Sequence, residues 1–200
     1  MKILKIIGII LALYLAYAII MGLVRKGPYE ITESKSIKGD AGVIWQNISR
    51  HHEFVKWNPW SKMDPDNKVT YKGEDGAVGS SYAWVGEKMG QGEMITTSLE
   101  PGKSHSCDLN FIKPFESKTF TTMLMEPEAD GTYKVSWVFK AESDFMEAAM
   151  TSAMFMDMKK ELSNSFKEGL ANLEKKVVEE TAALPPPAPP AAIADSVATI

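Results

Sequence analysis

The chain contains a single cysteine, Cys107, and only three histidines among its 200 residues. One cysteine excludes an intrachain disulfide and any zinc site built from several thiolates. The histidines are His51, His52 and His105, and no two of them have the HxxxH or HExxH spacing. Neighbouring helical side chains diverge by about 100°, so His51 and His52 cannot ligate one ion together. We therefore expect no metal site.

Catalytic loops and an excess of positive charge are also absent. The sequence has no glycine-rich phosphate-binding loop and no nucleophile elbow, so nucleotide chemistry and hydrolase chemistry are not expected. Beyond residue 26 the chain has 18 basic and 26 acidic residues, a net charge of −8. An acidic domain without a basic stripe suits neither nucleic acid nor charge-driven docking on anionic lipid. We expect no cofactor and no nucleic-acid partner.

The longest apolar run, residues 3–24, has Lys5 as its only charge. As a helix it spans roughly 33 Å, enough for a hydrocarbon core of about 30 Å. No small-residue cleavage site ends the run, which favours a retained transmembrane anchor over residues 1–26 rather than a cleaved signal peptide or a buried helix. Two basic residues flank each end, so membrane orientation stays open. We expect a single-pass protein of the bacterial inner membrane.

The other end, LPPPAPPAAIADSVATI, has five prolines in six positions and almost no charge. This composition favours an extended polyproline II chain and cannot bury a core. We expect residues 179–200 to be a disordered Pro/Ala-rich tail. The alternative is a docking site for a proline-reading partner.

Residues 27–178 have the size of one domain. Residues 29–37 alternate as a strand does, Asp40 offers a helix cap, and a second short helix over residues 51–56 should break before Pro59. Six strands with turn residues between them follow, over residues 68–73, 80–86, 91–100, 105–115, 117–127 and 131–142. A last helix is predicted over residues 153–178, with one apolar stripe at Phe155, Met158, Leu162, Phe166, Leu170, Leu173 and Val177.

This order of elements resembles the helix-grip fold of the START-like superfamily, also called SRPBCC, with its polyketide cyclase/dehydratase and lipid-transport proteins. Three local motifs carry the resemblance over residues 29–176. They are Trp57-Asn58-Pro59-Trp60 with Asp64 behind it, Gly90-Gln91-Gly92-Glu93-Met94, and Met154-Phe155-Met156-Asp157 followed by Phe166-Lys167-Glu168-Gly169-Leu170-Ala171-Asn172-Leu173. The resemblance implies an α+β fold in which about seven antiparallel strands curve around a long C-terminal helix, beyond an N-terminal transmembrane helix.

The resemblance also implies a cavity between the sheet and the last helix. Methionine suits the wall of a pocket that adapts to varied apolar guests, although it also fills irregular cores. Trp57 and Trp60 are expected at the cavity mouth. The expected ligand-binding residues are Trp57, Trp60, Trp84, Met94, Phe111, Met123, Met125, Met154 and Met158.

An enzyme would need an acid or base inside this cavity, and Glu93 is the best-placed carboxylate, although a solvent-facing role is the more common one for a strand residue. We expect His51, His52, Asp64 and Asp66 to face solvent. Three functions stay open: a membrane-tethered carrier of a small hydrophobic ligand, a cyclase or dehydratase acting in the same cavity, and an interaction domain with a filled interior. An apolar pocket favours the carrier, a buried carboxylate the enzyme, and a packed interior the interaction domain.

Overall fold

The computed structural model describes residues 2–114 and 116–185. It begins with the apolar helix α1 (Lys2–Arg25), which leads directly into strand β1 (Gly27–Lys38). Three short helices follow, α2 (Ala41–Ser49), α3 (His51–Trp57) and α4 (Trp60–Met63). The remaining elements are β2 (Lys68–Lys72), β3 (Ser81–Gly86), β4 (Gly90–Glu100), β5 (Ser104–Lys113), β6 (Ser117–Pro127), β7 (Thr132–Ser143), α5 (Phe145–Ala153) and α6 (Met158–Ala182).

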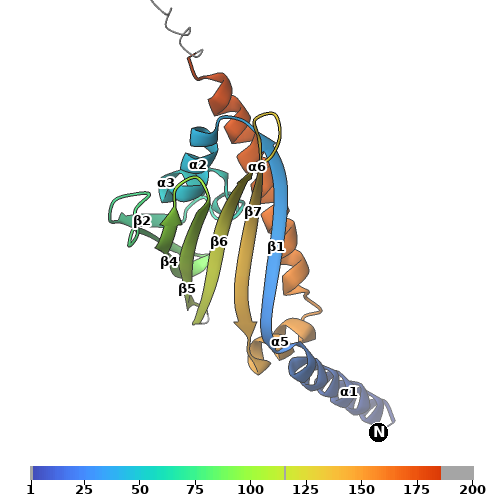
Figure 1. The fold of residues 1–200 in the computed structure, drawn as a ribbon. Helices are drawn as coiled ribbons and strands as arrows, with labels where there is room; N and C mark the ends of the chain where they lie inside the picture. The colour runs from blue at the N-terminus through green and yellow to red at the C-terminus, as the bar shows by residue number, and fades with distance from the viewer. Residues whose placement is uncertain (1, 115, 186–200) are drawn as a thin grey trace, which may run out of the picture.

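The seven strands form one antiparallel sheet in the order β1-β7-β6-β5-β4-β3-β2. Strands β2 to β7 form a continuous meander, and β1 pairs with β7 along its whole length, from Gly27 opposite Ser143 to Lys38 opposite Thr132. Figure 1 shows the sheet curving beside α6, with α2 and α3 at one end of the domain and α1 at the other. The predicted α+β helix-grip fold is confirmed.

Helices α2 and α3 begin and end close to where the sequence predicts, whereas α4 was not predicted. Asp40 caps α2, because its Oδ1 accepts a hydrogen bond from the Val43 backbone N at 3.0 Å. Arg50 has extended backbone angles and separates α2 from α3. Helix α3 ends at Trp57, before Asn58 and the buried Pro59. Because these helices are short and closely joined, they cover only one end of the sheet.

The prediction of one C-terminal helix over residues 153–178 is wrong at its start. Helix α5 ends at Ala153 and α6 begins only at Met158, and Phe155 between them has a left-handed backbone with φ 53°. Asp144 caps α5 and Asp157 caps α6, each carboxylate accepting from a backbone N three residues later. Phe155 is consequently 77% exposed instead of joining the apolar stripe. Helix α6 continues to Ala182, into the segment expected to be a tail.

The apolar stripe of α6 packs against the sheet from Phe166 onward. Phe166, Leu170, Leu173 and Val177 are almost completely buried. The ring of Phe166 stacks on that of Trp137 from β7, with centroids 4.5 Å apart. Among the strands, helix α6 contacts mainly β1 and to a lesser extent β7, so strands β4 to β6 are covered by α2 and α3 at one end only.

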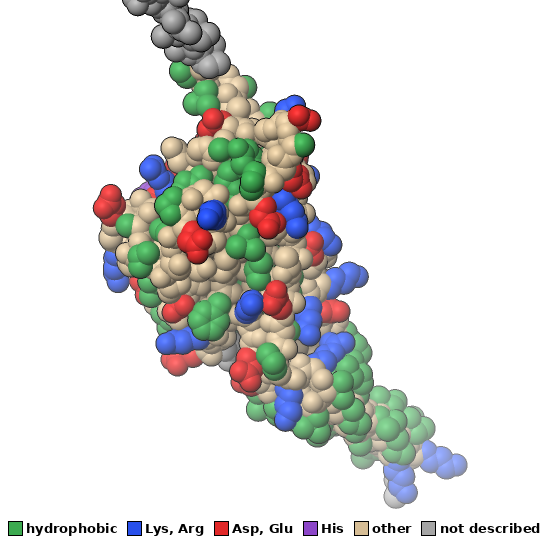
Figure 2. Space-filling view, viewed as in Figure 1, with side chains coloured by type: hydrophobic (Ala, Val, Ile, Leu, Met, Phe, Trp, Pro, Cys, Tyr) green, Lys and Arg blue, Asp and Glu red, His purple; other side chains and the backbone are tan. Residues whose placement is uncertain are grey.

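Helix α1 is long and apolar enough to cross a membrane, and most of its surface is exposed. Figure 2 shows hydrophobic side chains covering this helix, whereas both signs of charge are spread over the sheet domain. Its most extensive contact with the rest of the described chain is with α5. Residues 186–200 of the expected tail, and Phe115 of the predicted fifth strand, lie outside the described residues.

Candidate ligand-binding site

One face of the sheet, the inner face, meets α6. Ser163 of α6 donates a hydrogen bond to Glu33 of β1, and Lys35 of β1 lies 3.1 Å from Glu174 of α6, which assigns the odd-numbered residues of β1 to this face. Residues opposite each other in register share a face. The strand registers extend this assignment across the sheet. The residues of the other strands that lie on the inner face include Trp137, Met123, Cys107, Leu109, Phe111, Met94 and Trp84.

The centre of the inner face is filled by aromatic rings. Trp57 and Trp60 each meet the Trp137 ring edge to face, with centroids 5.5 Å and 5.6 Å away. Trp57 is only 1% exposed, and its Nε1 donates to the Asn47 carbonyl at 3.0 Å. Gly169 permits this packing, because a Cβ there would lie 2.8 Å from the Trp137 ring. The space between α6 and the middle of the sheet is therefore a packed core.

Toward the N-terminal half of α6 the inner face is less covered. Tyr29, Leu109, Phe111, Leu162 and Trp60 pack against the core yet remain half-buried. We call these five residues the open apolar end. Burial raises the pKa of the Tyr29 hydroxyl to about 12, so this group stays a neutral hydrogen-bond donor. The set offers an apolar surface with two polar groups, the Tyr29 hydroxyl and the Trp60 indole N–H, as ligand sites commonly do.

A hollow of about 330 Å³ lies beside the same end, at the turn between β5 and β6. It is lined by Asn110, Phe111, Ile112, Glu116, Ser117 and Lys118. The side-chain Oδ1 of Asn110 is buried there without a hydrogen-bond partner. Phe111 belongs both to this hollow and to the open apolar end.

The predicted ligand-binding residues fall into three groups. Trp57, Trp84, Met94, Met123 and Met125 are buried in the core of the inner face. Trp60, Phe111 and Met158 are half-buried near the open apolar end or the start of α6. Met154 is 61% exposed directly after the end of α5, so it is not among the residues buried between the sheet and α6, which corrects its assignment as a cavity residue.

Glu93 lies on the opposite face of β4 from Met94, outside the space between the sheet and α6. Its carboxylate accepts a hydrogen bond from Ser81 Oγ at 2.8 Å and lies 3.8 Å from Lys72 Nζ. The solvent-facing alternative for Glu93 is therefore the one that the structure supports. A general acid at this position would have no access to a ligand on the inner face.

The expectation that His51 faces solvent is wrong. His51 is 1% exposed and His105 is 4% exposed, and both Nε2 atoms approach Thr96 Oγ1, at 3.0 Å and 2.9 Å. Cys107 Sγ lies 3.2 Å from His105 Nε2. Sequence spacing did not reveal this cluster, because its members lie on α3, β4 and β5. His52, the neighbour of His51, is exposed as expected and pairs with Asp75 at 2.8 Å.

The cluster could be read as a metal site, since its three donor atoms lie within 4.8 Å of one another. Its hydrogen bonds favour another reading. His105 Nδ1 donates to the Ile48 carbonyl at 2.8 Å, so its Nε2 accepts from Thr96, while His51 Nε2 donates to the Ser80 carbonyl at 3.2 Å. Ligation through His51 Nε2 would place the proton on Nδ1, which is buried without a partner. Burial lowers the pKa of both histidines and raises the pKa of the Cys107 thiol to about 12. This is a neutral network that joins α3 to the sheet.

Asp64 is also buried, contrary to expectation, whereas Asp66 is exposed. Asp64 Oδ2 accepts hydrogen bonds from the backbone N atoms of Lys88 and Met89, at 2.8 Å and 3.1 Å. The carboxylate thus holds the turn between β3 and β4 against the end of α4. Its role is structural.

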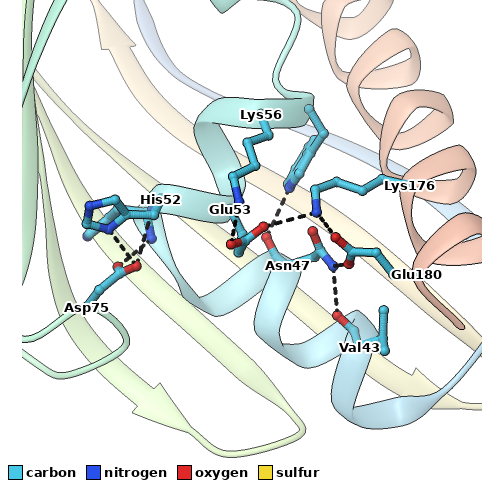
Figure 3. A network of polar contacts seen from close by, with 10 residues as sticks. Val43, Asn47, His52, Glu53, Lys56, Asp75, Lys176 and Glu180 are labelled. Atoms are coloured by element: carbon cyan, nitrogen blue, oxygen red, sulfur yellow. Dashed lines mark hydrogen bonds and ion pairs between the residues drawn. The ribbon is translucent and has the colours of Figure 1, made fainter. Parts of the chain in front are cut away.

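A second hollow, of about 420 Å³, lies between α3 and the C-terminal half of α6. Figure 3 shows the charged network beside it: Lys176 bridges Glu53 and Glu180, and Asn47 donates to Glu180 Oε2 at 2.6 Å. Lys56 also pairs with Glu53, at 2.7 Å. These contacts fix α2 and α3 to α6. The polar lining does not suit a hydrophobic ligand.

No protein-family model matches the sequence, and comparison with curated proteins finds no match. Solved structures do match. A protein from Mesorhizobium loti is 15% identical, with a TM-score of 0.56, covering 76% of this chain and 98% of that one. Major latex-like protein 151 from Panax ginseng is 13% identical, with a TM-score of 0.51, covering 79% and 99%.

The Aha1 dimer from Colwellia psychrerythraea is 17% identical, with a TM-score of 0.51, covering 74% of this chain and 96% of that one. Identities this low relate the folds and carry no activity from one protein to another. The chain has the helix-grip fold of these proteins, a curved seven-stranded antiparallel sheet around a long C-terminal helix. In this chain an apolar N-terminal helix precedes that fold.

Proposed function

We propose that this chain is a membrane-tethered member of the START-like superfamily that binds a small hydrophobic ligand at the open apolar end. The observation that carries the proposal is the half-buried set Tyr29, Trp60, Leu109, Phe111 and Leu162 on the face that meets α6. These apolar side chains lie on a concave face and are left partly in water. Covering them with an apolar guest removes apolar surface from water, which lowers the free energy of the complex.

Two features support a carrier or binding role over catalysis. The side chains of the open apolar end are apolar except for the Tyr29 hydroxyl and the Trp60 indole N–H, and Glu93 is on the other face of the sheet. The packed rings of Trp57, Trp137 and Phe166 close the far side of this end. A guest would therefore sit near the N-terminal half of α6, on the side of the domain nearest α1 (Figure 1).

The test is binding of an apolar fluorescent probe to the full chain in nanodiscs. Phe111→Ala should weaken binding at least threefold, because Phe111 faces the site and meets Trp84 at 5.9 Å. The matched control is Phe120→Ala, since Phe120 is 57% exposed on the outer face of the neighbouring strand. Equal affinity in both variants would contradict the assigned site.

The second function is an interaction domain with a filled interior, and the packed aromatic core favours it. The probe experiment separates the two, because an interaction domain of this kind would give no saturable probe binding in the wild-type protein. Tryptophan emission supplies an independent readout, since Trp60 belongs to the site and Trp84 contacts Phe111 beside it.

A further inference from the structure

Helix α5 carries an exposed methionine stripe. Met146, Met150 and Met154 follow at four-residue spacing and are 67%, 38% and 61% exposed, so they share one helix face. Phe155 and Met156, which follow Met154 in the chain, are also exposed, at 77% and 38%. Contiguous exposed apolar side chains of this kind mark a surface that another apolar phase covers.

The other face of α5 packs along the second half of α1. Gly22 allows the close approach, since a Cβ there would lie 2.8 Å from both the Ala149 Cβ and the Phe145 ring. Further along α1, the Tyr17 ring stacks on that of Phe155 at 5.9 Å. The contact therefore continues over more than one turn of α1, and α5 must lie at the same depth as that half of the helix.

Side chains of α1 also satisfy backbone carbonyls at the end of α5 and just after it. The Tyr14 hydroxyl donates to the Ala153 carbonyl at 2.5 Å, and Arg25 Nη1 reaches the Met156 carbonyl at 3.5 Å. In water such terminal carbonyls are solvated without help. In a bilayer each unpaired carbonyl costs several kcal/mol, so hydrogen-bond donors on α1 would stabilise these carbonyls there.

We propose that α5 and residues 154–156 form a lipid-contacting element, which enters the leaflet beside α1 with its methionine stripe against the acyl chains. The inference rests on the proposed membrane anchor. Tyr14 and Gly22, which both contact the element, are eight residues or roughly 12 Å apart along α1. The element therefore lies at the same depth in the membrane as this stretch of α1. The carboxylates of Asp144 and Asp157 serve as helix caps on either side of the element, and Glu147 lies in the first turn of α5, near Asp144.

This placement brings the open apolar end to the lipid surface. Tyr29 follows α1 directly in the chain and packs under the start of α6, where Lys159 Nζ lies 5.1 Å from its ring centroid. A hydrophobic ligand could then pass between the bilayer and Tyr29 without crossing bulk water. The substrate class implied is a membrane-resident apolar molecule.

The test uses the full chain in liposomes, labelled with an environment-sensitive dye at a new cysteine. Met154→Cys reports on the element, and Val78→Cys is the matched control, because Val78 is 63% exposed in the loop before β3. Cys107 is 3% exposed, and wild-type protein measures any background labelling. Spin-labelled acyl chains should quench the dye at residue 154 at least twofold and leave residue 78 unchanged, whereas aqueous iodide should do the reverse.

Three results would overturn the inference, and they are distinguishable. Iodide reaching residue 154 as readily as residue 78, in protein that resists alkaline carbonate extraction, would refute the lipid contact and leave the anchor intact. Shielding of residue 154 from both quenchers would indicate a protein partner in place of lipid. Release of the chain by carbonate would refute the membrane anchor, and this inference with it.

Discussion

Phe166 is the residue on which the two layers of the domain meet. It is 1% exposed, stacks on Trp137 and meets the Trp60 ring at 6.0 Å. The helical spacing of α6 predicted its burial, because a stripe with spacings of three and four can face only one side. Its aromatic partners come from α4 and β7, and only the folded chain brings them together.

We expect Phe166→Ala to lower the free energy of unfolding by about 3–5 kcal/mol, since the removed ring leaves a cavity among rigid neighbours. The measurement is a denaturant melt of the full chain in detergent. Val178→Ala, at a 51% exposed position of the same helix, should change stability by less than about 0.5 kcal/mol. A loss below about 1 kcal/mol for Phe166→Ala would mean that the ring is not in the core.

His105 should make stability depend on pH. Burial lowers its pKa from 6.5 to about 4, so the folded protein holds it neutral while the unfolded chain protonates it below pH 6.5. The buried neutral His105 therefore contributes fully to the free energy of unfolding above pH 6.5. This contribution, roughly 3 kcal/mol, is lost as the pH falls toward 4.

The measurement is a series of urea melts between pH 7.5 and 4.5. His105→Gln should flatten the dependence, and His52→Gln, which changes an exposed histidine, should retain it. An unchanged slope in His105→Gln would contradict the buried neutral network. Residue spacing did not predict this network: we expected both His51 and His52 to face solvent, whereas only His51 is directed inward from α3.

At the scale of elements, the sheet and helices α2 and α3 were predictable, and α4 and the start of the last helix were not. Strand alternation and turn residues placed six strands of the meander, and Pro59 placed the break after α3. Residues 153–157 have apolar periodicity and contain neither proline nor glycine, so they looked helical. Asp144 and Asp157 mark the two true starts, and their cap bonds could have been suspected from the sequence.

The contact between α1 and α5 should depend on Gly22. Gly22→Leu places a side chain where Ala149 and Phe145 now lie, so we expect α5 to separate from α1. Hydrogen exchange of the α5 amides in nanodiscs should rise at least tenfold. Gly8→Leu is the control, because a Cβ at Gly8 meets nothing within 4 Å. The same exchange rates in both variants would show that the close approach is dispensable.

For the whole molecule, the sequence indicated an apolar site between sheet and helix but not its place. The rings of Trp57, Trp60, Trp137 and Phe166 come from four separate elements and fill the middle of that space. This leaves the open apolar end, near the N-terminal half of α6, as the accessible apolar surface, on the side of the domain where α1 lies (Figure 1). Burial of the tryptophans depends on these distant contacts, which residue spacing does not encode.

The most direct test of a membrane-tethered ligand carrier is native mass spectrometry of the full chain released from nanodiscs. The account predicts a population heavier than the chain by one small apolar molecule. That population should fall at least threefold in Phe111→Ala and persist in Phe120→Ala. A wild-type spectrum containing only the mass of the chain, after incubation with extracted membrane lipids, would contradict the account.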